Sequence, residues 1–206
     1  MGLYANHVLP RLIDWVLSRS LVSELRATAL ATAEGEVLEI GFGTGLNLPY
    51  YPKGVVKLAA LDLAVMLPRK VERRIAAAGI PVEQIQAGGE GLPFESRRFD
   101  CVVTTFTLCS IAEVASALRE IRRVLKPTGS YLFLEHGRSE DQRVARWQDR
   151  LNGIQRLVGG GCNLNRPIDR LVREAGLEIT HFERSRLPKT PRILAEHYLG
   201  RARVRD

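Results

Sequence analysis

The chain alternates between two patterns of apolar and polar positions. Short, almost continuously apolar runs are typical of strands that a sheet buries on both faces, and they alternate with segments whose apolar residues recur at helical spacing. The expected strands cover residues 36–41, 56–62, 81–88, 99–108, 130–137, 177–184 and 192–202. The expected helices cover residues 8–18, 21–31, 64–79, 112–129 and 166–176. This alternation predicts an α/β fold with a doubly wound parallel sheet and helices on both faces.

The clearest helix is the one expected over residues 112–129. Leu118, Ile121, Val124 and Leu125 repeat at helical spacing, and Pro127 and Gly129 are the expected stop signals. Its position directly before an apolar run is typical of the helix–turn–strand units of a parallel sheet.

Two features depart from the simple alternation. Only "SRLPKT" separates the last two strand segments, which predicts an antiparallel pair at the end of the chain. Residues 137–164 are too many for a loop and are partly helical, so we expect an insertion or lid after the fifth strand. The rest reads as a single domain over residues 1–206, with an N-terminal helical cap over residues 1–34.

Composition and charge narrow the class of protein. Apolar residues make up 45% of the chain and charged residues 26%, as in an ordinary globular protein. Three cysteines without paired spacing argue for a reducing compartment, and neither a membrane-spanning run nor a signal peptide is evident, so we expect a cytoplasmic protein. The net charge of +7 is spread among acids without a nucleic-acid-binding motif. We therefore expect no nucleic-acid partner and no membrane span, although peripheral membrane contact and the oligomeric state stay open.

The stretch "VLEIGFGTGLNLPYYP", residues 37–52, carries the strongest chemical signal. A strand ends shortly after Glu39, and Gly41, Gly43 and Gly45 follow at alternate positions. Glycines at the carboxyl end of a parallel strand let the backbone approach a ligand closely. A second strand ends at Asp62, about 20 residues further on, where an acid binds ribose hydroxyls. This pattern predicts a site for a nucleoside-bearing cofactor, the alternative being glycines that serve only a tight turn.

The spacing favours S-adenosylmethionine over a dinucleotide. A dinucleotide fingerprint would have its third glycine at position 46, which is Leu46. Glu39 beneath the turn is unfavourable for a pyrophosphate, but it suits a ligand that carries an ammonium group and a sulfonium.

The chain resembles class I S-adenosylmethionine-dependent methyltransferases in "VLEIGFGTG", in "LPFESRRFDCVVTTFTL" and in "LREIRRVLKPTGSYLFLEHG". The resemblance implies a Rossmann-like sheet of seven strands whose last strand is antiparallel. It also implies a set of cofactor-binding positions around the methionine end, the ribose, the adenine and the floor of the site. Glu39, Gly41, Gly43, Gly45 and Asn47 would surround the methionine end, and Asp62 would bind the ribose. The adenine would be bordered by Leu63, Gly89 and Glu90, and Thr105 would lie on the floor of the site. Gly88 stands where many relatives have an aspartate for adenine, so backbone groups or Glu90 are the alternatives there.

A second, partial resemblance concerns the methyl acceptor. "LCSI", "EHG", the pair Trp147–Gln148 and "GGCNLNR" are similar to stretches of animal methyltransferase-like thiol S-methyltransferases. That resemblance implies methyl transfer to the sulfur of a small thiol. Oxygen or nitrogen transfer to a quinone, phenol or phospholipid amine is the first alternative. A nucleic-acid or protein methyltransferase and a non-catalytic cofactor-binding module are the others.

The candidate acceptor and catalytic residues follow from positions at strand ends and in the flanking segments. Glu135 and His136 end the fifth strand, and His136 is the candidate base, with a loop-orienting role as the alternative. The expected pocket residues are Tyr4, His7, Phe106, Trp147 and Cys162. Cys101 and Cys109 are expected in the core. No metal site is expected, because the four histidines show no ligand spacing.

Overall fold

A computed structural model describes residues 8–64 and 66–205 of the chain and contains one seven-stranded sheet. The strands are β1 (Gly35–Ile40), β2 (Val55–Asp62), β3 (Val82–Gln86), β4 (Phe99–Thr105), β5 (Leu125–His136), β6 (Leu177–Arg186) and β7 (Glu196–Val204). Their order is β3-β2-β1-β4-β5-β7-β6. The pairs among β1 to β5 are parallel, and β7 is antiparallel to both β5 and β6. The expected doubly wound sheet with an antiparallel last strand is confirmed.

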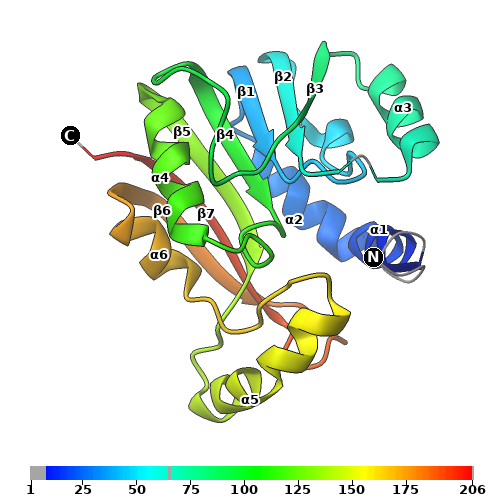
Figure 1. Cartoon of the computed structure of the whole chain (residues 1–206), viewed down its shortest axis with the longest axis vertical. Helices are drawn as coiled ribbons and strands as arrows, with labels where there is room; N and C mark the ends of the chain where they lie inside the picture. Colours follow the sequence, from blue (N-terminus) through cyan, green and yellow to red (C-terminus); the bar gives the residue numbers. More distant parts are fainter. Residues whose placement is uncertain (1–7, 65, 206) are drawn as a thin grey trace.

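Helices cover both faces of this sheet (Figure 1). The α-helices are α1 (Leu9–Leu17), α2 (Ser20–Leu30), α3 (Pro68–Ala77), α4 (Val114–Val124), α5 (Gln142–Val158) and α6 (Ile168–Glu174), with a short 3-10 turn, η2 (Leu48–Tyr50), after β1. Alternate strand residues belong to two cores. Leu38 and Val102 pack with α4 and α6, whereas Val37 and Val103 pack with the end of α2 and with α3. The continuously apolar strands are thus explained by burial on both sides.

The boundary between α4 and β5 differs from the expectation. The helix ends at Val124, and Leu125 is already extended and pairs with Phe99, so Pro127 and Gly129 lie within β5 instead of ending the helix. A proline disfavours helical backbone in the residue that precedes it, so the helix ends upstream of Pro127.

The segment after β5, residues 137–164, contains helix α5 and lies at the carboxyl edge of the sheet. Asp141 caps α5 by accepting hydrogen bonds from the backbone N–H groups of Arg143 and Val144. Figure 1 shows α5 beyond the carboxyl ends of β4 and β5, at the same edge of the sheet as α1. Within the described residues, no helix has both the length and the apolar character needed to cross a membrane.

Candidate functional site

The glycine turn after β1 contains three glycines with left-handed backbone. Gly41, Gly43 and Gly45 have φ values of 76°, 58° and 76°. A Cβ on Gly41 would lie 2.1 Å from Oγ1 of Thr107, so this glycine allows two loops to pack. A Cβ on Gly43 would meet only Cε of Met66 at 3.6 Å and the carbonyl oxygen of Gly41 at 3.9 Å, both at ordinary contact distances. Gly43 therefore leaves room for a ligand.

Asp62 connects the end of β2 to this turn. Its Oδ2 accepts a hydrogen bond of 2.7 Å from the backbone N–H of Gly43, and its Oδ1 accepts one of 3.2 Å from Ala64. Phe42, Gly43 and Asp62 line a cavity of about 220 Å³ that continues toward β3. The acid and the open glycine thus share one hollow at the carboxyl edge of the sheet, where open α/β sheets bind ligands.

The residues expected near adenine lie beside the end of β2, where the backbone N–H of Ala87 donates to the carbonyl of Asp62. The Leu63 side chain is 70% exposed at the end of β2. A Cβ on Gly88 would lie 3.4 Å from Leu63 and 2.9 Å from Oε2 of Glu90, so the three positions meet. Gly89 instead faces the core, where a Cβ would lie 3.1 Å from Ile40. This arrangement leaves Glu90 and the exposed Leu63 available at the expected adenine edge.

Glu39 lies beneath the turn in a fully buried polar network. Its Oε1 accepts a hydrogen bond of 2.9 Å from Nδ2 of Asn47, and its Oε2 accepts one of 2.7 Å from the hydroxyl of Tyr51. Burial raises the pKa of Glu39 to about 7, against the opposing effects of the Tyr51 hydrogen bond and the positive charge of Arg26. Asn47 also donates to Oγ1 of Thr105 at 3.0 Å. Glu39, Asn47 and Thr105 are therefore brought together as a unit.

Arg26 on α2 completes this network and was missed by the sequence analysis. Its Nη1 donates to Oδ1 of Asn47 at 2.6 Å and to Oγ1 of Thr105 at 2.9 Å, and its Nε is buried without a partner among the described residues. The signal was present, since Arg26 lies four residues after Val22 and four before Leu30, on the buried face of the helix. A cation on an apolar helix face indicates an internal partner.

A second missed residue, Asp14, fixes α1 to the glycine turn. This aspartate is 3% exposed, and its Oδ1 accepts hydrogen bonds from Oγ1 of Thr44 at 2.5 Å and from Nη1 of Arg74 at 2.7 Å. Its Oδ2 pairs with Lys70. Burial alone would raise the pKa of Asp14, but the hydrogen bonds from Arg74, Lys70 and Thr44 lower it to about 2. The N-terminal helix is thus bound to the turn and to α3 by charge.

A larger cavity of about 740 Å³ lies beside the turn and is mostly apolar. Its walls come from α1 and the start of α2, from the ends of β4 and β5, from α5 and the turn after it, and from residues 187–197. They include Ile13, Val16, Phe106, Val158, Leu194 and His197. Phe106 has a φ of 54°, and its ring packs edge-on against His197 with centroids 5.6 Å apart. Phe106 lines this cavity, and the next residue, Thr107, packs on Gly41. The cavity therefore lies close to the glycine turn.

The structure places some of the expected acceptor-site residues in this cavity and others elsewhere. Phe106, His136 and Cys162 line it. Tyr4 and His7 lie outside the described residues. Trp147 does not line it: the side chain is 53% exposed and packs under the guanidinium of Arg150. The reason is the phase of α5, because the next residue, Gln148, is fully buried and bonds to the backbone of Ser139, Gly137 and Ile193.

Glu135, which was expected to be a catalytic residue, does not line the cavity. Its buried carboxylate accepts hydrogen bonds of 2.9 and 3.1 Å from the backbone N–H groups of Thr107 and Leu108. Burial raises its pKa to about 7. Successive strand residues point to opposite faces, so Glu135 holds the turn after β4 while His136 faces the cavity. Glu135 is therefore a positioning residue for the loop that carries Phe106.

His136 contacts sulfur. Its Nε2 lies 2.9 Å from Sγ of Cys162, and its Nδ1 is buried with no partner among the described residues. Burial lowers the pKa of His136, but the contact with Cys162 outweighs it and the net direction is upward. Cys109, expected in the core, is buried and lies close to both. By contrast, burial lowers the pKa of His197 to about 4, which keeps that ring neutral.

The residues around the turn fit S-adenosylmethionine. Gly43 and Asp62 line the same hollow at the carboxyl edge of the sheet, which admits a ligand. The buried carboxyl of Glu39, held close to Asn47, lies beneath the turn, where its ionised form would favour a cationic ligand.

The comparisons with known proteins agree with this geometry. Residues 38–133 match the family model of a methyltransferase domain. The chain is 29% identical over 196 residues to thiol S-methyltransferase TMT1A of Homo sapiens, covering 89% of this chain and 77% of that protein.

Solved structures share the fold. A methyltransferase from Bacillus halodurans, titled as putative, superposes with a TM-score of 0.73 at 19% identity, over 89% of this chain and 98% of that one. The Burkholderia thailandensis 1,6-didemethyltoxoflavin-N1-methyltransferase, solved with bound S-adenosylhomocysteine, gives 0.64 at 16% identity, over 100% and 92% of the chains. In its glycine turn, its sheet order and the methyltransferase domain matched over residues 38–133, the chain is similar to class I S-adenosylmethionine-dependent methyltransferases.

Proposed function

We propose that the protein transfers a methyl group from S-adenosylmethionine to the sulfur of a small, largely apolar thiol. The observation that carries the proposal is the apolar cavity of about 740 Å³ beside the glycine turn. Its size lies within the ~300–1,000 Å³ that small-molecule sites occupy. The similarity to a human thiol S-methyltransferase supports a thiol over other small acceptors.

The chemistry asks little of the protein beyond placement. When bound, S-adenosylmethionine supplies a methyl group on a positively charged sulfur, which a nucleophile takes by in-line displacement. Gly43, Asp62 and the unit of Glu39 and Asn47 would hold the cofactor, and Phe106 would place the acceptor beside it. Holding two reactants in line in a dry site contributes up to ~7–11 kcal/mol to catalysis. A thiol, with an ordinary pKa of ~8.5, ionises more readily than a phenol and so needs less help from a base.

The wall formed by α5 and residues 159–164 would act as the lid over this reaction. Gly160 and Gly161 have positive φ, and Gly159, Val158 and Cys162 line the cavity. A Cβ on Gly160 would lie 3.0 Å from Leu9 of α1, so the lid and the N-terminal helix approach each other across the cavity. Closure there would keep water from the reacting sulfur.

The test is a panel of acceptors. The purified protein with S-adenosylmethionine should methylate alkyl and aryl thiols and should act far more slowly on phenols, hydroquinones and amines of the same shape, as measured by mass spectrometry of the products. Methylation confined to oxygen, nitrogen or carbon would refute the thiol assignment.

A matched pair of variants tests the cavity. Val16→Trp places an indole into the cavity wall and should raise KM for bulky thiols several-fold, without changing the affinity for S-adenosylhomocysteine. Val56→Trp is the control, because Val56 is 64% exposed at the start of β2 and does not line the cavity. Equal kinetics in the two variants would show that the acceptor binds elsewhere.

A further inference from the structure

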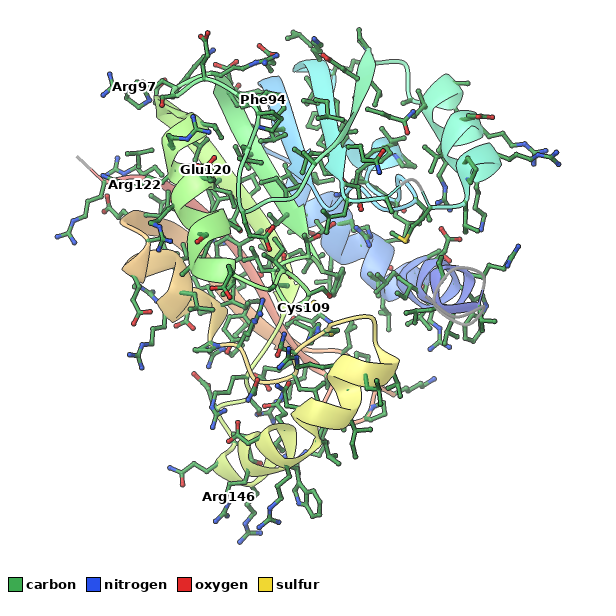
Figure 2. All side chains as sticks on the ribbon, in the orientation of Figure 1. Phe94, Arg97, Cys109, Glu120, Arg122 and Arg146 are labelled. Carbon is green, nitrogen blue, oxygen red and sulfur yellow. The ribbon has the colours of Figure 1, made fainter. Side chains whose placement is uncertain are left out.

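Two sulfurs and one imidazole meet in the wall of the acceptor cavity. Cys109 follows β4, His136 ends β5, and Cys162 lies in the turn after α5. One ligand atom from each residue lies within 4.8 Å of the other two, and all three residues line the cavity. Figure 2 shows Cys109 in the space between the carboxyl edge of the sheet and α5, where these segments converge.

The geometry of this Cys–His–Cys cluster is close to that of a zinc site. With Zn–S bonds of ~2.3 Å and a Zn–N bond of ~2.0–2.1 Å, the ligand atoms of a tetrahedral site lie ~3.5–3.8 Å apart. The three ligand atoms lie within 4.8 Å of one another, and the pair of His136 Nε2 and Cys162 Sγ, now 2.9 Å apart, would open by roughly 0.6 Å to admit the ion. Cys162 belongs to a glycine-rich turn that can accommodate such a shift.

The donor set also selects the metal. Thiolate and imidazole ligands favour zinc and other soft or borderline ions over magnesium or calcium. Three protein ligands with a fourth position open to a cavity are typical of catalytic zinc sites, and closed structural sites have four. Because the three residues line the cavity, its space supplies the fourth position.

The surrounding charge suits a site that takes an anionic fourth ligand. Two thiolates, one neutral imidazole and Zn²⁺ sum to zero charge, and a coordinated substrate thiolate adds one negative charge. Arg166 is the nearby cation: its Nη1 bonds to the carbonyl of Leu108, and Cys109 and Cys162 are among the groups that interact with its charge. A guanidinium in this position offsets the charge of the occupied site.

We propose that Cys109, His136 and Cys162 bind one zinc ion whose open position takes the sulfur of the acceptor; this second part rests on the proposed function. Zinc binding releases the two thiol protons of Cys109 and Cys162. The acceptor thiol then loses its proton to solvent as its sulfur coordinates. In the transfer a sulfur–methyl bond forms on the acceptor while the methyl–sulfonium bond of the cofactor breaks, giving two neutral thioethers. A thioether is a weaker zinc ligand than a thiolate, so the product leaves.

The metal-binding half is tested without turnover. Metal-free protein is titrated with Co²⁺, whose absorption gains a sulfur-to-metal charge-transfer band when cysteine thiolates coordinate it, and then with Zn²⁺ in competition with a chromophoric chelator. We expect one ion per chain and the charge-transfer band. Cys109→Ala, Cys162→Ala and His136→Gln should each weaken zinc binding by at least ~10–100-fold, the cost of losing even an outer partner of a ligand.

Cys101→Ala is the matched control, because Cys101 is a buried cysteine of β4 that lies in the core beside α2 and α3, outside the cluster. It should keep full zinc affinity. Absence of the charge-transfer band in the unmodified protein, or equal zinc affinity in the control and the three ligand variants, would overturn the site. The unmodified protein gives this answer even if a variant fails to fold.

Activity separates the two halves of the proposal. If zinc binds as described but no thiol is methylated, the metal site stands and the proposed function fails. If thiols are methylated at the same rate by metal-free and zinc-loaded protein, the proposed function stands and the role of zinc in holding the acceptor is wrong. Cobalt-loaded protein gives a direct readout as well, because a coordinating thiol should shift the charge-transfer band in the absence of S-adenosylmethionine.

Discussion

Replacing Asp14 with asparagine tests whether charge holds the N-terminal helix against the glycine turn. The substitution keeps the shape of the side chain but removes the anion that Lys70, Arg74 and Thr44 surround. The folded pKa of about 2, against an ordinary value of 3.8, corresponds to roughly 2.4 kcal/mol at 1.36 kcal/mol for each unit. We expect Asp14→Asn to lower the free energy of unfolding by about 2–3 kcal/mol at pH 7.

The pH dependence gives this prediction its sign. Because folding lowers the pKa of Asp14, its contribution is fully present above pH ~4 and is lost as the pH falls toward 2. The difference between the unmodified protein and Asp14→Asn should therefore shrink as the pH is lowered from 7 to 3. Urea unfolding followed by circular dichroism at each pH measures it.

The control for Asp14 is an aspartate with the same pKa in a different setting. The hydrogen bond from Arg138 lowers the pKa of Asp149 to about 2 as well, but the Asp149 side chain is 43% exposed. Solvent screens such a pair, so Asp149→Asn should cost less than ~1 kcal/mol. Equal losses in the two variants, or a loss at Asp14 that does not change with pH, would falsify the argument from burial.

Three further predictions concern the cofactor side. Gly43→Ala should greatly weaken S-adenosylhomocysteine binding in calorimetry, whereas Gly79→Ala, which also has a positive φ (69°) and open space around its Cβ, should strain the backbone equally and keep full affinity; equal affinities would exclude Gly43 from the site. Arg26→Met should cost about 3–5 kcal/mol in urea unfolding, because Asn47 and Glu39 lose a buried cationic partner; a cost below ~1 kcal/mol would show that the network is dispensable. S-adenosylmethionine affinity should rise as the pH increases from 5.5 to 7.5, because burial raises the pKa of Glu39 to about 7 and the cationic cofactor favours its charged form; Glu39→Gln should flatten this profile, and an unchanged slope would assign the effect to another group.

The sequence predicted the parts of the site that depend on local pattern. The glycine turn and Asp62 are adjacent to strands whose apolar runs are unambiguous, so both their positions and their proximity followed from the alternation. Arg26 and Asp14 were missed because a charged residue on a helix is usually solvated, and only tertiary packing shows which partners surround it. Trp147 was misplaced because the phase of α5 depends on the backbone bonds of Gln148.

The cluster of Cys109, His136 and Cys162 could not be read from spacing. Metal sites are recognised in sequences when two ligands lie within one turn or helix, and here each ligand comes from a different segment of the chain. The boundary between α4 and β5 is a smaller example: helical spacing continues through Leu125, but pairing with Phe99 draws that residue into the sheet.

The residues that line the large cavity and the residues of the cofactor turn come from different parts of the chain. Of the described residues that line it, only Phe106, Cys109 and Ser110 fall within the matching domain of residues 38–133, whereas Gly43, Asp62 and Glu39 all do. The remaining walls come from α1 and α2 at one end of the chain and from residues 136–197 at the other. On the proposed function, substitutions at the cavity-lining positions of these flanks would change which acceptor is accommodated, while Asp14 and Arg26, which lie in the same flanks, keep the cofactor turn intact. Exchanging only the cavity-lining positions of both flanks between two similar proteins, while Asp14, Arg26 and the central segment are kept, would be a direct route to new acceptor selectivity.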